Sequence, residues 1–79
     1  MPLYFFLWTD ENKRHLADHE ISPEEFEEVV LQPDYVDSSR TTGRPIAFGY
    51  TSNGRFLCCV YDAIDESTVY PVTAYEVEP

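Results

Sequence analysis

The middle of the chain holds two apolar, aromatic-rich runs on either side of a tight-turn signal. The runs cover residues 45–51 and 55–61, and Asn53-Gly54 lies between them. Asn and Gly both tolerate the positive φ angles of a type I′ turn, so this pattern predicts a β-hairpin with a two-residue loop. Both faces of the hairpin are apolar, so we expect a central position in a sheet that is covered on at least one side.

The two-residue loop also predicts the register of this hairpin. Ser52 pairs with Arg55, and the pairing continues outwards to Ile46 and Tyr61. Side chains alternate between the faces of a strand. One face then contains Ile46, Phe48, Tyr50, Leu57, Cys59 and Tyr61, and the other contains Ala47, Gly49, Thr51, Phe56, Cys58 and Val60. In this register Arg55 lies on the same face as Tyr50 and Tyr61.

The chain before the hairpin predicts a strand and a short helix. The apolar run over residues 3–8 is interpreted as a buried strand. Residues 12–19 form a helix of about two turns, which Thr9 or Asp10 can cap. Leu16 is its only strongly apolar residue, so this helix depends on packing against the rest of the protein.

A second helix has clearer start signals. Ser22 is an N-cap, Pro23 occupies the first helical position, and Glu25 completes a capping box. Ile21 and Phe26 form a hydrophobic staple across this start. The apolar side chains of the helix share one face, which predicts that it covers the sheet. Three carboxylates turn outwards: Glu24, Glu27 and Glu28.

The remaining segments predict further strands. Residues 35–40 form a weak edge strand, residues 41–44 and 65–67 form turns, and residues 69–77 form the last strand. Pro71 cannot donate to a ladder, so this last strand is at an edge or bulged there. The fold class is therefore α+β: one domain over residues 1–79 with a short N-terminal strand, two helices and an antiparallel meander of about four strands.

Composition and charge restrict the function. A chain of 79 residues with 43% hydrophobic residues builds one small core. Fifteen acidic residues against five basic ones give a net charge of −10. Such a charge repels phosphate backbones, so binding to RNA or DNA is disfavoured. The charge serves either solubility or an acidic interaction surface.

The cysteines and the N-terminal run indicate the compartment. Cys58 and Cys59 are adjacent in a predicted strand and point to opposite faces, so they do not form a disulfide. A chain without a disulfide framework suits a reducing compartment. The run over residues 3–8 is too short to span a membrane and lacks the basic flank of a signal peptide. We expect a cytoplasmic protein with no membrane partner.

Several stretches of the chain share a pattern with one known family. They are Trp8 at the start of the first helical segment, His15-Leu-Ala-Asp-His-Glu-Ile-Ser-Pro-Glu-Glu25, Val29 to Pro33, the hairpin from Ala47 to Tyr61, and Val72-Thr-Ala-Tyr75. Together they resemble the BrnT family of small ribonuclease toxins, which have a RelE-like fold. The resemblance covers nearly the whole chain. The resemblance implies the same fold. It also implies a ribonuclease activity, with an antitoxin as the partner protein.

The chain departs from this family where the toxin's chemistry would lie. Tyr75 stands where the family has Arg, and an acidic tail follows it. His15 stands where the family has Asn. Glu20 replaces the Gly that ends the first helix, a position where left-handed backbone geometry suits Gly best. We therefore expect that the chain has inherited the fold of this family rather than its ribonuclease activity.

A metal-independent ribonuclease needs an acid, a base and cations near the phosphate. The candidate catalytic residues are His15, His19, Arg40, Arg44, Arg55 and Tyr61. The alternative is that the aromatic residues are core and that the stem of Arg55 packs over them. His15 and His19 also have a zinc-compatible i, i+4 spacing, with only Asp18 or Glu20 nearby as further ligands. We predict no metal and no cofactor.

Two functional hypotheses remain open. The first is a non-catalytic protein-interaction module that binds a basic or antitoxin-like protein, with a homodimer as an alternative. Its binding surface is either an uncovered aromatic sheet face that includes Tyr50 or the acidic helix face with Glu24, Glu27 and Glu28. The second is an RNA endonuclease toxin guided by a ribosome or an antitoxin. Convergence of the arginines and histidines within reach of one phosphate would favour the second.

Overall fold

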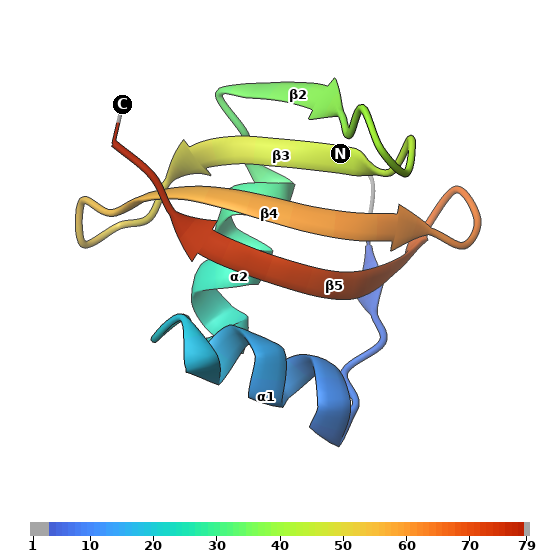
Figure 1. Cartoon of the computed structure of the whole chain (residues 1–79), viewed down its shortest axis with the longest axis horizontal. Coiled ribbons are helices and arrows are strands. Elements are labelled where there is room, and N and C mark those ends of the chain that lie inside the picture. The colour runs from blue at the N-terminus through green and yellow to red at the C-terminus, as the bar shows by residue number, and fades with distance from the viewer. Residues whose placement is uncertain (1–3, 79) are drawn as a thin grey trace.

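The secondary structure follows the predicted order of elements. The computed structural model describes residues 4–78. It contains β1 (Phe5–Phe6), α1 (Asp10–Asp18), α2 (Pro23–Leu31), β2 (Tyr35–Ser38), β3 (Pro45–Tyr50), β4 (Phe56–Ala63) and β5 (Thr68–Glu76) (Figure 1). The prediction of an α+β fold, with a strand, two helices and then a four-stranded antiparallel meander, is confirmed.

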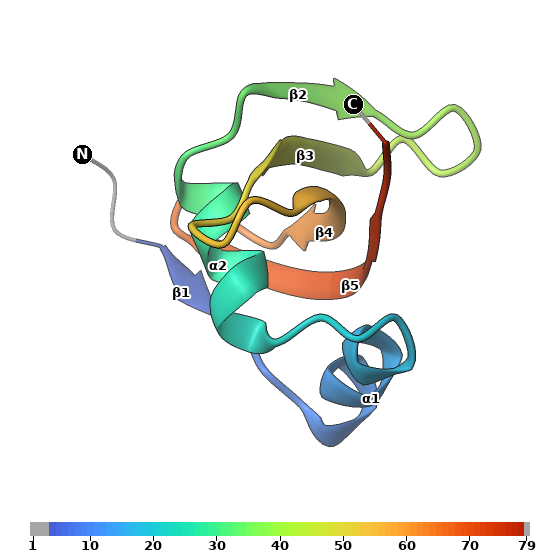
Figure 2. The same ribbon diagram turned by 90° about the vertical axis from the view of Figure 1, so that its left-hand side faces the viewer.

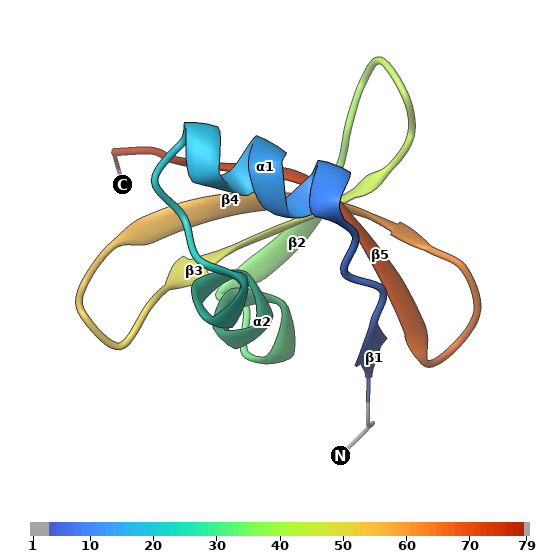
Figure 3. The ribbon, with the colours of Figure 1, turned by 90° about the horizontal axis from the view of Figure 1, so that it is seen from below.

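The strands form one mixed sheet in the order β1-β5-β4-β3-β2. The strands of the meander pair antiparallel, and β1 adds to β5 in parallel. The helix α2 crosses one face of β3 and β4, and α1 runs beside β5 (Figures 1 and 3). The side view in Figure 2 shows how the meander curves around α2. The other face of the meander is crossed by neither helix, and we call it the open face.

The core lies between α2 and the sheet. Its residues come from both helices, from the turn between them and from the inward positions of three strands, and they are Leu16, Ile21, Phe26, Val29, Val30, Ala47, Leu57, Cys59 and Ala74. Phe6, Trp8 and Tyr61 pack against this cluster. Removal of these apolar side chains from water is the main force that holds the helices on the sheet. The prediction that the second helix covers one sheet face is therefore correct.

A capping box marks the start of each helix. Ser22 accepts a hydrogen bond from the Glu25 amide, and Glu25 accepts one from the Ser22 amide. Thr9 and Asn12 form a second capping box, so α1 begins two residues earlier than predicted. The buried Asn12 side chain also donates to the Leu7 carbonyl at 2.9 Å, which fixes the chain between β1 and α1. Local side-chain chemistry therefore determines both helix starts.

The hairpin loop differs from the prediction. Thr51 donates its amide to the Arg55 carbonyl at 2.8 Å, so the loop consists of three residues, 52–54. Gly54 has a φ of +86°, whereas Asn53 is not left-handed. The Thr51 hydroxyl donates to the Asn53 side chain and accepts from the Arg55 amide. This local network favours a type I turn with one left-handed residue, so the predicted two-residue type I′ loop is wrong.

The longer loop shifts the register of β4 by one residue. Tyr50 pairs with Phe56, and Ile46 pairs with Val60. A shift of one residue exchanges the two faces of a strand. Leu57, Cys59 and Tyr61 therefore face α2 together with Ala47 and Gly49, and Phe56, Cys58 and Val60 share the open face with Ile46, Phe48 and Tyr50. The predicted membership of the two faces is wrong for all of β4.

The N-terminal run is less buried than predicted. The strand β1 covers only two residues, and Phe5 is 63% exposed, whereas Phe6 and Trp8 turn towards the core. This strand lies at the edge of the sheet and contacts the core from one side only, so alternate residues remain outside. Leu3 of the predicted strand lies outside the described residues.

The prediction of an edge strand is confirmed for β2, and of the two alternatives for the last strand the bulge is confirmed, because β5 lies between β1 and β4. β2 is the last strand of the sheet, and all four of its residues are exposed. The β4–β5 ladder changes register between Val60 and Tyr61, opposite Thr73 and Pro71. Pro71 therefore lies next to a bulge, as a residue without an N–H requires.

Glu20 lies between the two helices with a φ of 59°. Because a side chain in the left-handed region is strained, Glu20→Gly is expected to raise the free energy of unfolding by about 1 kcal/mol in urea denaturation. Glu20→Gln removes the charge and keeps the strain, so it should give no such gain. An equal gain in both variants would show that charge repulsion, and not backbone strain, is relieved.

Candidate functional site

The candidate catalytic residues are distributed over the molecule. Arg55 lies beside the hairpin loop, His15 and Arg44 lie near the opposite end of β4, and Arg40 lies in the exposed turn after β2. Arg44 is paired with Asp62, which is seven residues from Arg55 along the chain. A strand rises by about 3.3 Å per residue, so the two arginines are roughly 20 Å apart. They cannot hold the same phosphate.

The guanidinium of Arg55 forms hydrogen bonds and ion pairs with other residues of the protein. Its Nη1 donates to the Glu20 carbonyl at 2.9 Å and to both Glu25 carboxylate oxygens at 3.0 Å. Its Nε and Nη2 lie 3.2 Å from Glu76 Oε1. The Arg55 side chain is only 23% exposed. It joins the turn between the helices, α2 and β5, so its role is structural. The predicted position of Arg55 beside Tyr50 is a consequence of the incorrect register.

The ion pair also affects the acidity of Glu25. Partial burial raises the pKa of this carboxyl. Hydrogen bonds from the Ser22 amide and from Arg55 more than offset that effect and hold the pKa of Glu25 below its usual 4.5. The ionised form of Glu25 is therefore the form that the fold stabilises.

His15 and Arg44 line one small pocket. Its volume is about 110 Å³, and it is lined by Glu11, Asn12, His15, Arg44, Asp62, Tyr70, Pro71 and Val72. Arg44 Nε donates to Asp62 Oδ1 at 2.8 Å, and His15 Nδ1 lies 3.4 Å from the Val72 carbonyl oxygen. Two carboxylates, Glu11 and Asp62, stand beside one guanidinium and one imidazole. A phosphate entering this pocket would meet repulsion as well as attraction.

The other two candidates lie elsewhere. His19 is exposed at the end of α1, with its ring 6.2 Å from the ring of Tyr75. Tyr61 packs against the core on the α2 side of the sheet, and burial raises the pKa of its hydroxyl. Of the six residues, His15 and Arg44 line one pocket. His19 and Arg55 lie at the other end of α1, because Arg55 binds the carbonyl of Glu20, which follows His19.

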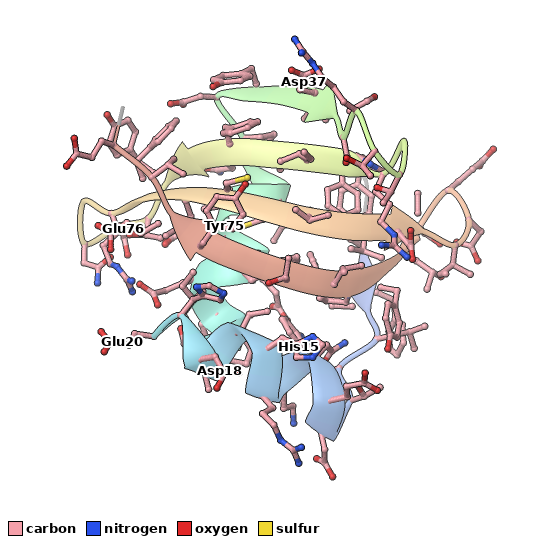
Figure 4. All side chains as sticks on the ribbon, in the orientation of Figure 1. His15, Asp18, Glu20, Asp37, Tyr75 and Glu76 are labelled. Atoms are coloured by element: carbon pink, nitrogen blue, oxygen red, sulfur yellow. The ribbon has the colours of Figure 1, made fainter. Side chains whose placement is uncertain are left out.

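The histidine spacing does not produce a metal centre. Figure 4 shows His15 and Asp18 along α1 and Glu20 beyond its end. Within residues 4–78, no group of three His, Cys, Asp or Glu side chains could hold a metal ion. In that same range, no helix has the length and apolar character needed to cross a bilayer.

Two carboxylates of the acidic helix face have partners inside the protein. Glu27 accepts a hydrogen bond from Trp8 Nε1 at 2.7 Å, and Glu28 accepts one from the Ser52 amide at 2.8 Å. Glu24 is exposed. Of the three glutamates predicted to bind a partner, two thus also fix the segment between β1 and α1, and the hairpin loop, to α2. Sequence reasoning missed these roles because both contacts join distant segments.

The open face carries an aromatic cluster. The rings of Tyr35 and Phe48 stack with centroids 4.6 Å apart, and those of Tyr50 and Phe56 lie 4.8 Å apart. Tyr35, Tyr50 and Tyr75 are 53%, 49% and 41% exposed. A shallow depression, which we call the aromatic groove, is lined by Asp34, Tyr35, Phe48, Tyr50, Phe56, Val77 and Glu78. The sequence pattern predicts the position of Tyr50 on this surface. The position of Phe56 beside it depends on the observed register of β3 and β4.

Comparison with protein-family models, curated proteins and solved structures gave no match. The functional argument therefore rests on the open face and the charged groups.

The side chains of Cys58 and Cys59 lie on opposite faces of the sheet, as predicted. Both thiols are free and buried. Cys59 belongs to the core, and Cys58 lies on the open face opposite Tyr75. Figure 4 shows Tyr75 on the side of the sheet away from α2. Burial raises the pKa of both thiols, so neither is an activated nucleophile.

Proposed function

We propose that the protein is a non-catalytic protein-interaction module with a BrnT/RelE-like fold. Its binding surface is the open face, and its partner is a protein segment with apolar and basic side chains. The observation that carries the proposal is the aromatic groove, where half-exposed rings of Tyr35 and Tyr50 lie over Phe48 and Phe56. Clustered aromatic residues on a surface mark interaction sites, because tyrosine rings bury a large area at little entropic cost.

The charge distribution supports a basic partner. The net charge is −10, and the exposed carboxylates of Asp34 and Glu78 border the aromatic groove. Such a field accelerates association with basic proteins and opposes association with RNA. The chain offers little to reverse this effect, because Arg44 and Arg55 are already paired with carboxylates.

An RNA endonuclease of a toxin-antitoxin pair is the second candidate function. The pocket that contains both His15 and Arg44 supports it, since a general acid or base stands there beside a guanidinium. Against it are the Asp62 carboxylate on Arg44, the position of Glu11 and the distance to Arg55.

A defined peptide tests the interaction proposal. A twelve-residue peptide of alternating Val and Arg is expected to bind the protein, and the matched peptide of Val and Glu is not. Tyr50→Lys should abolish the binding, because it removes a ring of the groove and places there a positive charge that repels the basic peptide. Glu24→Gln, on the helix side, should retain it. Isothermal titration calorimetry measures each affinity, and rising salt should weaken it.

The same preparations decide between the two functions. Purified wild-type protein is expected to leave RNA intact at low salt. Cleavage that is lost in both His15→Ala and Arg44→Met, with folding retained, would overturn the non-catalytic proposal. Equal binding of the basic peptide to wild type and Tyr50→Lys would show that the open face is not the binding surface.

A further inference from the structure

The aromatic groove has the chemistry of a cation site. We infer that it holds an arginine side chain of the partner protein, with the guanidinium over the aromatic rings and its N–H groups directed at the carboxylates of the rim. This inference rests on the proposed function, because it names the side chain that anchors the partner to the open face.

Two pairs of rings form the floor and sides of the groove. Tyr35 and Phe48 are nearly parallel, with an angle of 14° between their planes, and Tyr50 and Phe56 are tilted by 54°. The two pairs adjoin, because the Phe48 and Phe56 centroids are 6.4 Å apart. Together they line a volume of about 470 Å³. The faces of aromatic rings attract cations, and most strongly where water is partly excluded.

Two carboxylates stand at the rim without a basic partner of their own. Asp34 precedes β2, and Glu78 follows β5. The ion pairs found among residues 4–78 join Arg44 to Asp62 and Arg55 to Glu25 and Glu76. The backbone of Asp34 is held in place, because its amide donates to the Phe48 carbonyl at 2.7 Å. The two residues that carry these carboxylates line the aromatic groove and add a formal charge of −2 that an incoming cation can neutralise.

Arginine fits this arrangement better than an apolar side chain or lysine. An apolar side chain would remove the carboxylates from water without giving them a hydrogen bond, which is unfavourable. The lysine ammonium is strongly hydrated and does not stack. The planar guanidinium stacks on aromatic rings and donates to carboxylates from the same group.

A short peptide tests the inference. Fluorescence polarisation of a labelled Gly-Val-Arg-Val-Gly peptide is compared with the same peptide carrying citrulline, the neutral isostere of arginine. The arginine peptide is expected to bind at least about tenfold more tightly, and the lysine peptide about threefold more weakly than the arginine peptide. Equal affinities for arginine and citrulline, or for arginine and lysine, would overturn the inference.

Protein variants locate the effect. The double variant Asp34→Asn with Glu78→Gln and the single variant Tyr50→Leu should each reduce the preference for arginine over citrulline. Tyr50→Leu keeps an apolar side chain and removes the ring, so it separates cation attraction from apolar contact. Glu24→Gln, which removes one charge far from the groove, should leave the preference unchanged. An equal loss in Glu24→Gln would show that only the overall charge matters.

The outcomes distinguish this inference from the proposed function. Binding of the alternating Val and Arg peptide at the open face, without discrimination between arginine and citrulline, would leave the proposed function standing and reject the arginine site. Failure of that longer peptide to bind at the open face would reject both.

Discussion

Replacement of Arg55 with methionine is expected to lower the free energy of unfolding by about 2–3 kcal/mol. The guanidinium reaches Glu20, Glu25 and Glu76, which belong to three different segments of the chain. Methionine keeps most of the apolar stem but leaves the half-buried Glu25 carboxylate without its cation. Urea denaturation measures the loss. Arg44→Met is the matched control, because its single exposed ion pair is worth no more than about 1 kcal/mol.

The pH dependence of stability gives this prediction a second signature. The pKa of Glu25 in the folded protein lies below the unfolded value of about 4.5. A carboxyl with a lowered pKa stabilises the fold fully above pH 4.5 and loses that effect as the pH falls through the folded value. Arg55→Met should therefore reduce the acid sensitivity of the fold. Losses of similar size in both arginine variants, with unchanged acid sensitivity, would contradict the structural role of Arg55.

Phe26→Ala is expected to cost more, about 3–5 kcal/mol, and to leave the domain largely unfolded at room temperature. Phe26 is completely buried, and its ring contacts those of Phe6 and Trp8 at centroid distances of 6.4 and 5.5 Å. The cavity left by alanine would lie between α2 and β1. Circular dichroism and urea denaturation measure the effect.

Tyr50→Ala is the control for the opposite face. Tyr50 is half-exposed on the open face, so its truncation should cost no more than about 1 kcal/mol. The contrast tests which face of the sheet carries the core. A loss at Tyr50 as large as that at Phe26 would mean that both faces are needed for folding, which would leave no free surface for a partner.

Much of the fold follows from local chemistry that the sequence displays. The caps at Thr9 and Ser22 define the helix starts, and Pro71 marks a bulge because it lacks an N–H. The loop of the hairpin was missed for an equally local reason. Asn53-Gly54 favours two left-handed residues, but Thr51 binds the Asn53 side chain and the Arg55 amide, and this selects a longer loop. Side chains near a turn can thus override its sequence signature.

The functional surface was predictable in type but not in detail. An uncovered aromatic face with Tyr50 follows from the apolar pattern of the hairpin. The groove also needs Tyr35, Phe56 and Glu78, which come from three different parts of the chain and meet only in the observed register. The structural role of Arg55 was hidden for the same reason, because Glu25 and Glu76 are distant from it in sequence.

Mapping the bound peptide by NMR tests the central claim most directly. The amide spectrum of the isotope-labelled protein is recorded during titration with the alternating Val and Arg peptide. We predict that the largest shift changes fall on Tyr35, Phe48 and Tyr50, with little change along α2. Changes centred on Glu24 and the rest of α2, or a spectrum that the peptide leaves unaltered, would contradict the assignment of the open face as the binding surface.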